Sequence, residues 1–280
     1  MPSIALLTDS TSDMNAEALR EARAEMVPLQ VHFGSETLRD YVDISPDEFL
    51  ARLESSEALP RTSQPSPAAF SEAFDEALEN HDQVLALTVS SKLSGTYQSA
   101  HLGAAASQHE RIRIVDTLGA SVSLQMQVRR ARALIDAGMD IDTIVTALDE
   151  ERDQYHLLFF ADTLTYLQKG GRIGKAGQLL GTLLKVKPIL TCSDGEVALF
   201  ERTRSRPRAI EGLISYALGL DDVQRAAVLH DGTEDDDVSH LLDALSALVP
   251  RDEIIVNRYG ATVATHVGPR ALGICLFTNG

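Results

Sequence analysis

QVLALTV-SSKLSG-TYQSAHLGAAAS, residues 83–107, joins an apolar run, a polar turn and a small-residue helical pattern. The run at 83–89 has the length of a buried strand, and the pattern from about Thr96 to Ser107 predicts a helix. The same order recurs in two other places: 3–8 with about 15–25, and 111–115 with about 120–137, which stops at Gly138. Strands that alternate with helices predict βαβ units and a parallel sheet.

Other elements surround these units. A strand is predicted at 27–33, where apolar residues alternate, and helices are predicted from Ser45-Pro46 and from about Ala68 to Asn80. A polar loop rich in Pro and Ser, Pro60 to Pro67, separates the two helices. In parallel sheets ligands bind beyond the carboxyl ends of the strands, so the turns after 3–8 and 83–89 are candidate sites.

From about Tyr155 the pattern changes. The runs KPILTC and EVALFE flank Ser193-Asp194-Gly195, a signature of a hairpin. Before the hairpin we expect a strand at YHLLFFA, a short helix from Leu164 to Lys169 and another helix to about Lys185. After it we expect helices near 207–219 and 237–248 and the strands AAVLH, EIIVNRY and ALGICLF. We therefore predict an α/β protein of two domains: an N-terminal Rossmann-like domain with a parallel sheet (1–152) and a C-terminal α+β domain with a mixed sheet (153–280).

The composition narrows the classes of function. The chain has 280 residues and a net charge of −16, which argues against a broad nucleic-acid surface or adsorption to an anionic membrane. No apolar run approaches 18 residues, so we expect no integral membrane association. Cys192 and Cys275 form no C-x-x-C pair, and buried free thiols fit a cytoplasmic location.

The turn after residues 83–89 is a candidate anion site. Backbone N–H groups at a helix start are unpaired, and the hydroxyls of Ser94 and Thr96 add donors beside Gly95, which permits close approach of a ligand. The structural alternative is that Ser94 is an ordinary N-cap.

Two other hydroxyl-rich turns have structural alternatives. Thr62 and Ser63 precede a predicted helix, where they could form a simple turn and cap or join Ser94 at one anion. Asp9 and Asp13 could cap the helix that follows them; as a metal site they offer too few ligands.

Three basic features remain. Arg172 follows Gly170-Gly171, which could simply end a helix or place the Arg beside a cleft. Arg202 and Arg204 would share one face of an extended segment, either solvated or as a docking point. His266 is placed where a strand is predicted to end in a turn, and there it could hydrogen-bond a carboxylate.

Signatures of catalysis are missing from the sequence. Neither G-x-S-x-G nor a phosphate loop occurs. A triad of Ser94 with His266 and an unidentified Asp stays open as an alternative, since the chain order of a triad is free.

Together the motifs resemble the DegV family. The matching runs occur in order over essentially the whole chain: Thr8 to Thr11, Pro60 to Ser66, Ser90 to Ala100, Leu164 to Ile173, Lys187 to Leu190, Arg202 to Arg204, and His266 to Pro269. One departure is visible, because the family tends to have Gly-Pro-Gly-Ala where this chain has Gly268-Pro269-Arg270-Ala271.

The resemblance implies two α/β domains that enclose one long-chain fatty acid, such as palmitate. It implies that Thr62, Ser94 and the Gly95 backbone hold the carboxylate, with Arg172 and His266 near the head group. Some members are the lipid-binding subunit of a bacterial fatty-acid kinase and present the carboxylate for acyl-phosphate formation. The Arg202/Arg204 element resembles the part implicated in meeting that kinase, and Ser63 is a further candidate for the cleft or the contact.

Three functions are therefore considered: a carrier for a separate kinase, an enzyme that uses Ser94 itself, and a regulatory protein in which lipid is structural. We expect no metal and no cofactor besides the fatty acid as ligand. The apolar patterns 102–106 and 176–184 could line the acyl chain or be ordinary core faces.

Overall fold

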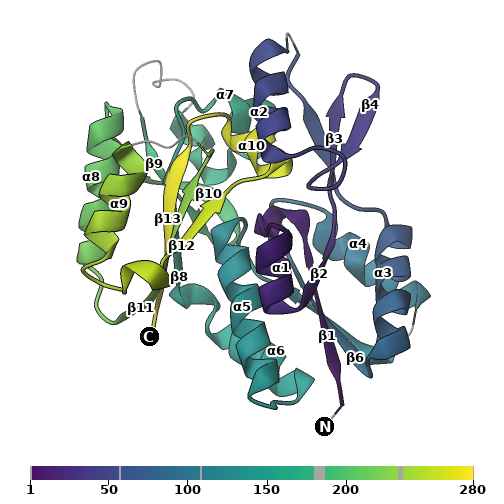
Figure 1. Ribbon diagram of the computed structural model, residues 1–280. Helices are drawn as coiled ribbons and strands as arrows, with labels where there is room; N and C mark the ends of the chain where they lie inside the picture. Colours follow the sequence, from purple (N-terminus) through teal and green to yellow (C-terminus); the bar gives the residue numbers. More distant parts are fainter. Residues whose placement is uncertain (1, 57, 108, 180–186, 233–235, 280) are drawn as a thin grey trace.

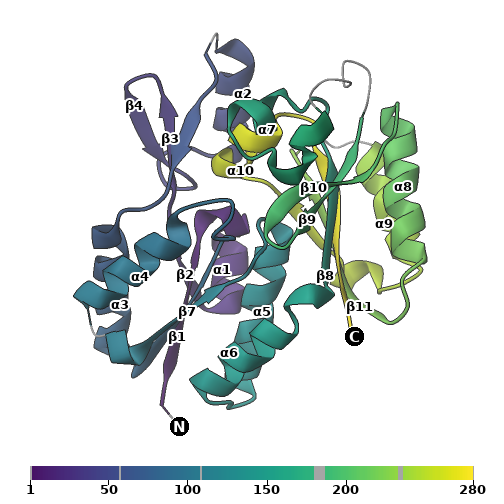
Figure 2. The same ribbon diagram turned by 180° about the vertical axis from the view of Figure 1, so that it is seen from behind.

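A computed structural model describes residues 2–56, 58–107, 109–179, 187–232 and 236–279. Its strands form three sheets: one of four strands, one of six and one of three. Both termini lie at one end of the molecule, and α2 (Pro46–Ser55), α7 (Thr165–Lys169) and α10 (Ala261–Val267) lie at the other (Figures 1 and 2).

The four-stranded sheet is parallel, with the order β2-β1-β6-β7. Its strands are β1 (Ile4–Asp9), β2 (Ala24–Val27), β6 (Gln83–Thr88) and β7 (Ile112–Asp116). Residues of α1 (Ala16–Ala22), α5 (Val122–Asp136) and α6 (Ile141–Glu150) pack on one face, and those of α3 (Pro67–Asn80) and α4 (Thr96–Ala106) on the other. The predicted parallel sheet of βαβ units is confirmed, while helix α6 was not predicted.

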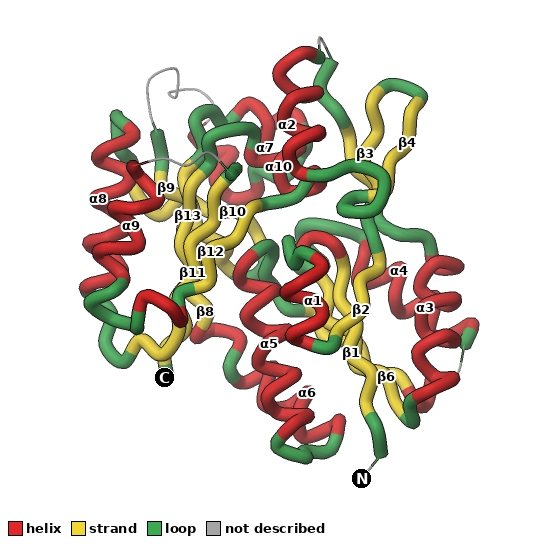
Figure 3. The backbone as a smooth tube through the Cα atoms, in the orientation of Figure 1, coloured by secondary structure: helices red, strands yellow, loops and turns green. Residues whose placement is uncertain are grey.

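The six-stranded sheet is mixed, with the order β10-β9-β8-β13-β11-β12. Its strands are β8 (Tyr155–Phe160), β9 (Ile189–Ser193), β10 (Glu196–Glu201), β11 (Val223–His230), β12 (Ile255–Arg258) and β13 (Leu272–Thr278). Only β11 and β12 pair in parallel among the described strands of this sheet. Its outer face is covered by α8 (Arg206–Leu218) and α9 (Asp236–Leu245), and its inner face looks toward α5 and α10 (Figure 3).

The predicted hairpin is confirmed at β9 and β10. Asp194 and Gly195 both have positive φ, 51° and 80°, as the tight turn between twisted strands requires. The mixed second sheet is likewise confirmed. The division at residue 152 falls between the last strand of the first sheet and the first strand of the second, and it stays a prediction.

A small antiparallel sheet, β4-β3-β5, lies above the parallel one (Figure 1). It contains β3 (Gln30–Phe33), β4 (Glu36–Arg39) and β5 (Arg61–Ser63). The single strand predicted at 27–33 is wrong, because the chain leaves β2 at Val27 and re-enters a different sheet at Gln30. Pro28, which has no N–H to donate to a ladder, lies in this break. β5 lies inside the loop predicted at 60–67, so that Thr62 is held by its pairing with Val31.

The segment that carries His266 is a helix, α10, and not the predicted strand end. The helix starts against two carboxylates: Asp40 accepts from the backbone N–H groups of Ala261 and Thr262, and Asp13 accepts from that of Gly260. These partners are more than 220 residues away in sequence, so the local pattern of Thr and Val residues did not reveal the helix.

The remaining short helices are 3₁₀: Ser10–Ser12, His109–Arg111, Arg152–Gln154, Gly174–Leu179 and Arg251–Glu253. The helix predicted as far as Lys185, with its lining residues up to Leu184, lies partly outside the described residues. Within the described ranges, no helix combines the length and the apolar character needed to cross a membrane.

Candidate ligand-binding site

An apolar cavity lies where the carboxyl ends of the parallel strands meet the inner face of the six-stranded sheet. The centres of water-sized molecules have about 110 Å³ of space in it. Since a single water needs roughly 10–15 Å³ by this measure, the cavity has room for a narrow chain of many atoms. Its lining comes from both halves of the chain: Thr11, Leu29, Thr62, Val89, Leu93, Ser94, Ala120, Ser121, Leu157, Phe159, Leu167, Arg172, Cys192, Val197, Leu229, Thr262, Val263, His266, Val267 and Ala271.

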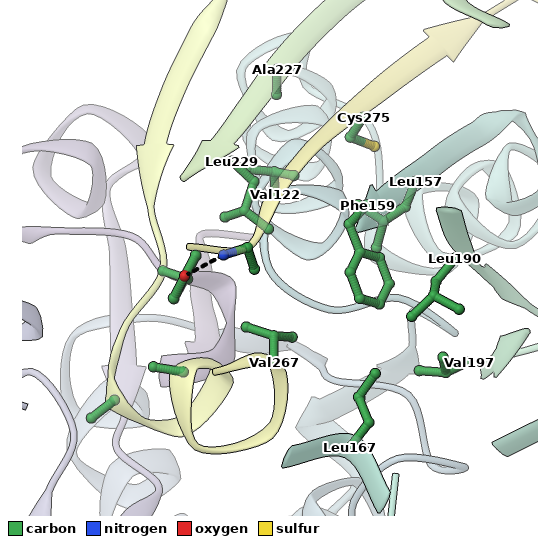
Figure 4. Close-up of a cluster of buried hydrophobic side chains, with 14 of the residues drawn as sticks. Val122, Leu157, Phe159, Leu167, Leu190, Val197, Ala227, Leu229, Val267 and Cys275 are labelled. Atoms are coloured by element: carbon green, nitrogen blue, oxygen red, sulfur yellow. Dashed lines mark hydrogen bonds between the residues drawn. The ribbon is translucent and has the colours of Figure 1, made fainter. Parts of the chain in front are cut away.

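One wall of the cavity, here called the sheet wall, consists of Leu157, Phe159, Cys192, Val197 and Leu229. These side chains project from the inner face of the sheet because alternate residues of a strand point to the same side. In Figure 4, Leu157 and Phe159 project toward the same side, and Leu167 and Val267 lie across from them. Burial raises the pKa of the Cys192 thiol to about 12, so this wall carries no charge at neutral pH.

The opposite wall, here called the strand-end wall, consists of Thr11, Val89, Ala120, Ser121 and Thr262. Its residues follow β1, β6 and β7 or begin α10. Apolar groups dominate the sheet wall, whereas three of these five residues carry hydroxyls.

Buried carboxylates hold the strand-end wall from behind. Asp9 accepts from the backbone N–H groups of Thr11 (2.9 Å) and Val89 (2.7 Å), and so fixes the ends of β1 and β6 together. Asp13 accepts from the Ser121 hydroxyl at 2.5 Å. Burial raises the pKa of Asp9 to about 6, and burial also raises the pKa values of Asp13 and Asp40.

The prediction that Asp9 and Asp13 cap the helix at about 15–25 is wrong. Asp9 caps the 3₁₀ helix Ser10–Ser12, but Asn15, and not Asp13, caps α1. Among the described residues, no group of three or more His, Cys, Asp or Glu side chains is arranged to hold a metal ion.

The cavity opens at a polar mouth. Thr62, Arg172 and His266 line the cavity and also line an open surface pocket, here called the outer pocket. The other residues of the outer pocket include the cations Arg61 and Lys169, with no acidic side chain among its described lining. A negatively charged group at the boundary between the two pockets would therefore meet donors and positive charge.

His266 and Thr62 meet at this mouth although 204 residues separate them. The Nε2 atom of His266 lies 2.9 Å from Oγ1 of Thr62. Burial, with Arg172 nearby, lowers the pKa of His266 to about 4, so its imidazole is neutral at pH 7 and can donate one hydrogen. Gly170 lies against the other ring nitrogen, Nδ1, where any Cβ atom would collide with the ring.

Ser94 lines the cavity beside Thr62 and His266. Its Oγ lies 2.8 Å from Oγ1 of Thr96 and accepts from the Thr96 backbone N–H at 3.3 Å. The N-cap position of α4 belongs to Gly95, whose backbone starts the helix next to Ser94 without a side-chain cap. The structural alternative, in which Ser94 is the N-cap, is therefore wrong; its hydroxyl bonds to Thr96 and also lines the cavity.

Arg172 connects the two halves of the mouth. Its Nε donates to the carbonyl of Leu93 at 3.0 Å, and its Nη1 donates to the carbonyl of Gly170 at 2.7 Å. Gly170 ends α7 and Gly171 has a φ of 73°, so the glycines end the helix and thereby place Arg172 at the cavity. The glycines therefore end a helix and Arg172 also lies beside a cleft, so both alternatives considered for this segment hold.

Four predicted residues are not part of the cavity lining: Gly95, which starts α4 next to Ser94, and Ser63, Arg202 and Arg204. The Ser63 hydroxyl lies 2.9 Å from Nε2 of His32, on the side of β5 opposite Thr62. Arg202 and Arg204 are exposed on the segment between β10 and α8, with buried Thr203 between them. The shared face of Arg202 and Arg204, and a role for these residues, stay predictions.

Several lining residues were missed by reasoning from the sequence. Thr11 belongs to a predicted turn, but Ser121, Thr262 and Cys192 showed no local signal of a site. The triad alternative finds no support in the hydrogen bonds: Ser94 is bonded to Thr96, and Nε2 of His266 is bonded to Thr62.

Comparisons with known proteins agree with this architecture. A DegV-domain protein of Deinococcus radiodurans is 38% identical over 98% of each chain. A DegV family protein of Thermus thermophilus, whose structure is described in terms of fatty acid binding, has a TM-score of 0.90 and 38% identity over 99% of this chain and 100% of that one. DegV of Bacillus subtilis, described as a fatty acid binding protein, has a TM-score of 0.88 and 31% identity over 100% of both chains.

The match is not confined to single motifs. The family model described as an uncharacterised protein of the DegV family matches residues 3–279. The predicted resemblance is therefore confirmed, and this chain belongs to the DegV family.

Proposed function

We propose that this protein binds one long-chain fatty acid, such as palmitate, with its acyl chain in the apolar cavity and its carboxylate at the mouth. The observation that carries the proposal is that Thr62, Arg172 and His266 line both the cavity and the outer pocket. An amphiphile with one polar end satisfies both environments. The fatty acid binding described for the relatives from Thermus thermophilus and Bacillus subtilis supports the same ligand class.

The acyl chain supplies most of the affinity. A buried methylene contributes about 0.8 kcal/mol, so a tail of about 14 methylenes gives roughly 11 kcal/mol as an upper limit. Association costs on the order of 4–15 kcal/mol. Binding is therefore tight only if the cavity is already formed before the ligand enters. The sheet wall, whose side chains are fixed by strand pairing, provides such a cavity.

The head group determines orientation. A desolvated carboxylate without partners would cost several kcal/mol, and each donor offsets about 1.5–3 kcal/mol of this cost. The hydroxyls of Thr62 and Ser94 and the backbone of Gly95 are the donors that we assign to it. The neutral imidazole of His266 donates its one hydrogen to Oγ1 of Thr62, which leaves the Thr62 hydroxyl hydrogen for the carboxylate. Arg172 adds a positive charge beside them, which further favours an anion at this end.

The protein acts as a carrier in this proposal, in the cytoplasm, and a separate fatty-acid kinase converts the presented carboxylate to an acyl phosphate. Exposed Arg202 and Arg204, with Ser63, are the proposed contacts for that partner. The resemblance to kinase subunits of the family supports this finer assignment. Two functions compete with this one: an enzyme that uses Ser94, and a regulatory protein in which the lipid is structural.

The first experiment is native mass spectrometry of protein purified without added lipid. We expect the added mass of one fatty acid. A double variant, Thr62→Ala with Ser94→Ala, should lose the ligand or retain less of it, because two carboxylate donors are gone. The matched control is Thr88→Ala with Ser99→Ala, which also removes one Thr and one Ser hydroxyl; these are buried and donate to the carbonyls of Val115 and Pro65.

Unchanged ligand retention in the Thr62/Ser94 double variant would refute the assigned head-group site. Incubation with ATP or acyl esters separates the carrier from an enzyme, since turnover by the protein alone would reject the carrier. A purified partner kinase that leaves the bound fatty acid unphosphorylated would favour the structural-lipid alternative.

A further inference from the structure

The inner face of the six-stranded sheet is organised in rows that run across the strands. Leu157 of β8 pairs with Cys275 of β13. On its other side, the pairing of Leu158 with Thr191 sets Cys192 of β9 beside Leu157 at the next position. Cys192 pairs in turn with Val197 of β10. Residues directly opposite each other in a sheet share a face, so these four residues form one row, here called the middle row.

The cavity covers only part of this face. Phe159, one row nearer the mouth, lines it, as do Leu157, Cys192 and Val197 of the middle row. Tyr155, one row farther from the mouth, does not belong to the described lining. The direction follows from the chain, because β8 runs from Tyr155 to Phe160 and continues through α7 to Arg172 at the mouth.

The row beyond the cavity is filled by aromatic rings. Tyr155 pairs with Phe277, and their ring centroids are 4.8 Å apart. Rows of a strand face are two residues apart, which corresponds to roughly 6.5–7 Å. The cavity therefore stops about one row after Phe159, at the middle row.

A polar pocket, here called the far pocket, begins on the other side of the middle row. The centres of water-sized molecules have about 280 Å³ of space in it, by the same measure as for the cavity. Its lining includes Arg152, His156 and Asp194. Leu157 and Cys192 are the two residues that it shares with the cavity. The Cys192 thiol donates to the carbonyl of Leu118, another residue of the far pocket, at 3.3 Å, which fixes its side chain in this partition.

We propose that Leu157 and Cys192 set the upper limit on the length of the acyl chain, an inference that rests on the proposed binding of a fatty acid. A chain that ends at the partition is enclosed by apolar groups. A longer chain must displace Leu157 or Cys192 and expose its end to the polar far pocket, where a methylene gains nothing from burial. Each methylene beyond the partition therefore forfeits about a fourfold gain in affinity.

The test is competition among saturated fatty acids from C12 to C20 in equal amounts, with the bound species measured by native mass spectrometry. Leu157→Ala opens the partition and is expected to shift the bound distribution toward longer chains. Cys192→Leu fills the end of the cavity and is expected to shift it toward shorter ones. For a difference of two carbons, the preference ratio should change by up to roughly fifteenfold, in opposite directions for the two variants.

The control is Leu158→Ala. Leu158 is the next residue on the same strand and is similarly buried, 2% exposed against 6% for Leu157, but it packs with α8 and α9 on the outer face. It should lower stability without changing the chain-length distribution. If Leu157→Ala does not fold, Leu157→Val tests the same shift, with about a fourfold effect for one methylene.

The outcomes separate this inference from the proposed function. Absence of any fatty acid on the unmodified protein would overturn both. Binding by the unmodified protein, with the same chain-length distribution in Cys192→Leu and in the folded Leu157 variant, would overturn the length limit alone. A shift caused equally by Leu158→Ala would also overturn it, because loosening of the sheet would then explain the change.

Discussion

The two walls of the cavity are built on different physical principles. The sheet wall consists of apolar side chains that strand alternation places on one face, and their neighbours along the chain fill a solid core on the other face. The strand-end wall consists of backbone turns and hydroxyls held by Asp9, Asp13 and Asp40, which are all buried. One wall depends on local pattern and packing, and the other depends on hydrogen bonds between distant segments.

This difference predicts how each wall responds to change. An apolar residue that faces open space loses few contacts when it is shortened, so the sheet wall should tolerate substitution. A carboxylate that satisfies buried N–H groups has no substitute nearby, so the strand-end wall should fail when one is removed.

The largest effect is expected for Asp40→Ala. Asp40 accepts from the backbone N–H groups of Ala261 and Thr262 at 3.0 and 3.1 Å, and both would be left buried without a partner. We expect a loss of about 3–5 kcal/mol in the free energy of unfolding, measured by urea denaturation. Asp136→Ala, which removes an exposed aspartate paired with Arg23 and Arg132, is the control and should cost far less, because solvent screens surface ion pairs. A loss of similar size in both would refute the contrast.

The charge of Asp9 gives the next effect. Burial raises its pKa from 3.8 to about 6, so the folded state holds a proton that the unfolded state has released. Stability from this group is therefore fully present below pH 4 and is lost as the pH rises from about 4 to 6. The free energy of unfolding of the protein should fall by about 3 kcal/mol relative to Asp9→Asn over this window. A constant difference between the two proteins, measured from pH 4 to 7, would show that Asp9 titrates normally.

The sheet wall should show a smaller effect. Phe159→Leu shortens a ring that already borders the cavity, so we expect a loss of about 1 kcal/mol. Phe160→Leu, the neighbour in the solid core of the outer face, should lose about 2 kcal/mol. Urea denaturation of lipid-free protein measures both, and a larger loss for Phe159 would mean that the ring packs as tightly as the core.

The smallest effect is expected at the turn between α10 and β13. Arg270 lies between α10 and β13 with a φ of 60°, a conformation that favours glycine, and its exposed guanidinium lies 3.4 Å from Asp162. Arg270→Gly should raise the free energy of unfolding by about 0.5 kcal/mol, since relief of backbone strain exceeds the loss of a surface ion pair and the added freedom of the unfolded chain. Thermal unfolding measures the change, and destabilisation would show that the ion pair dominates. The turn keeps its left-handed conformation although the residue departs from the pattern of the family.

Several features could be predicted because they depend on local sequence. Apolar runs followed by helical patterns predicted the parallel sheet, and Ser193-Asp194-Gly195 predicted the hairpin between β9 and β10. Gly170-Gly171 predicted a helix end. The order of the motifs identified the family, and with it the residues Thr62, Ser94 and His266 that the fold then brought to one cavity.

Tertiary structure alone decided the rest. The helix that carries His266 forms because Asp40 and Asp13 approach its first turn from the other half of the chain, and no residue near His266 records that contact. Leu157 and Leu158 are the same amino acid in adjacent positions, yet one borders the cavity and the other fills the core. Sequence determines which side chains are apolar and how they alternate, but whether an apolar face meets another element or an open space depends on how distant segments pack.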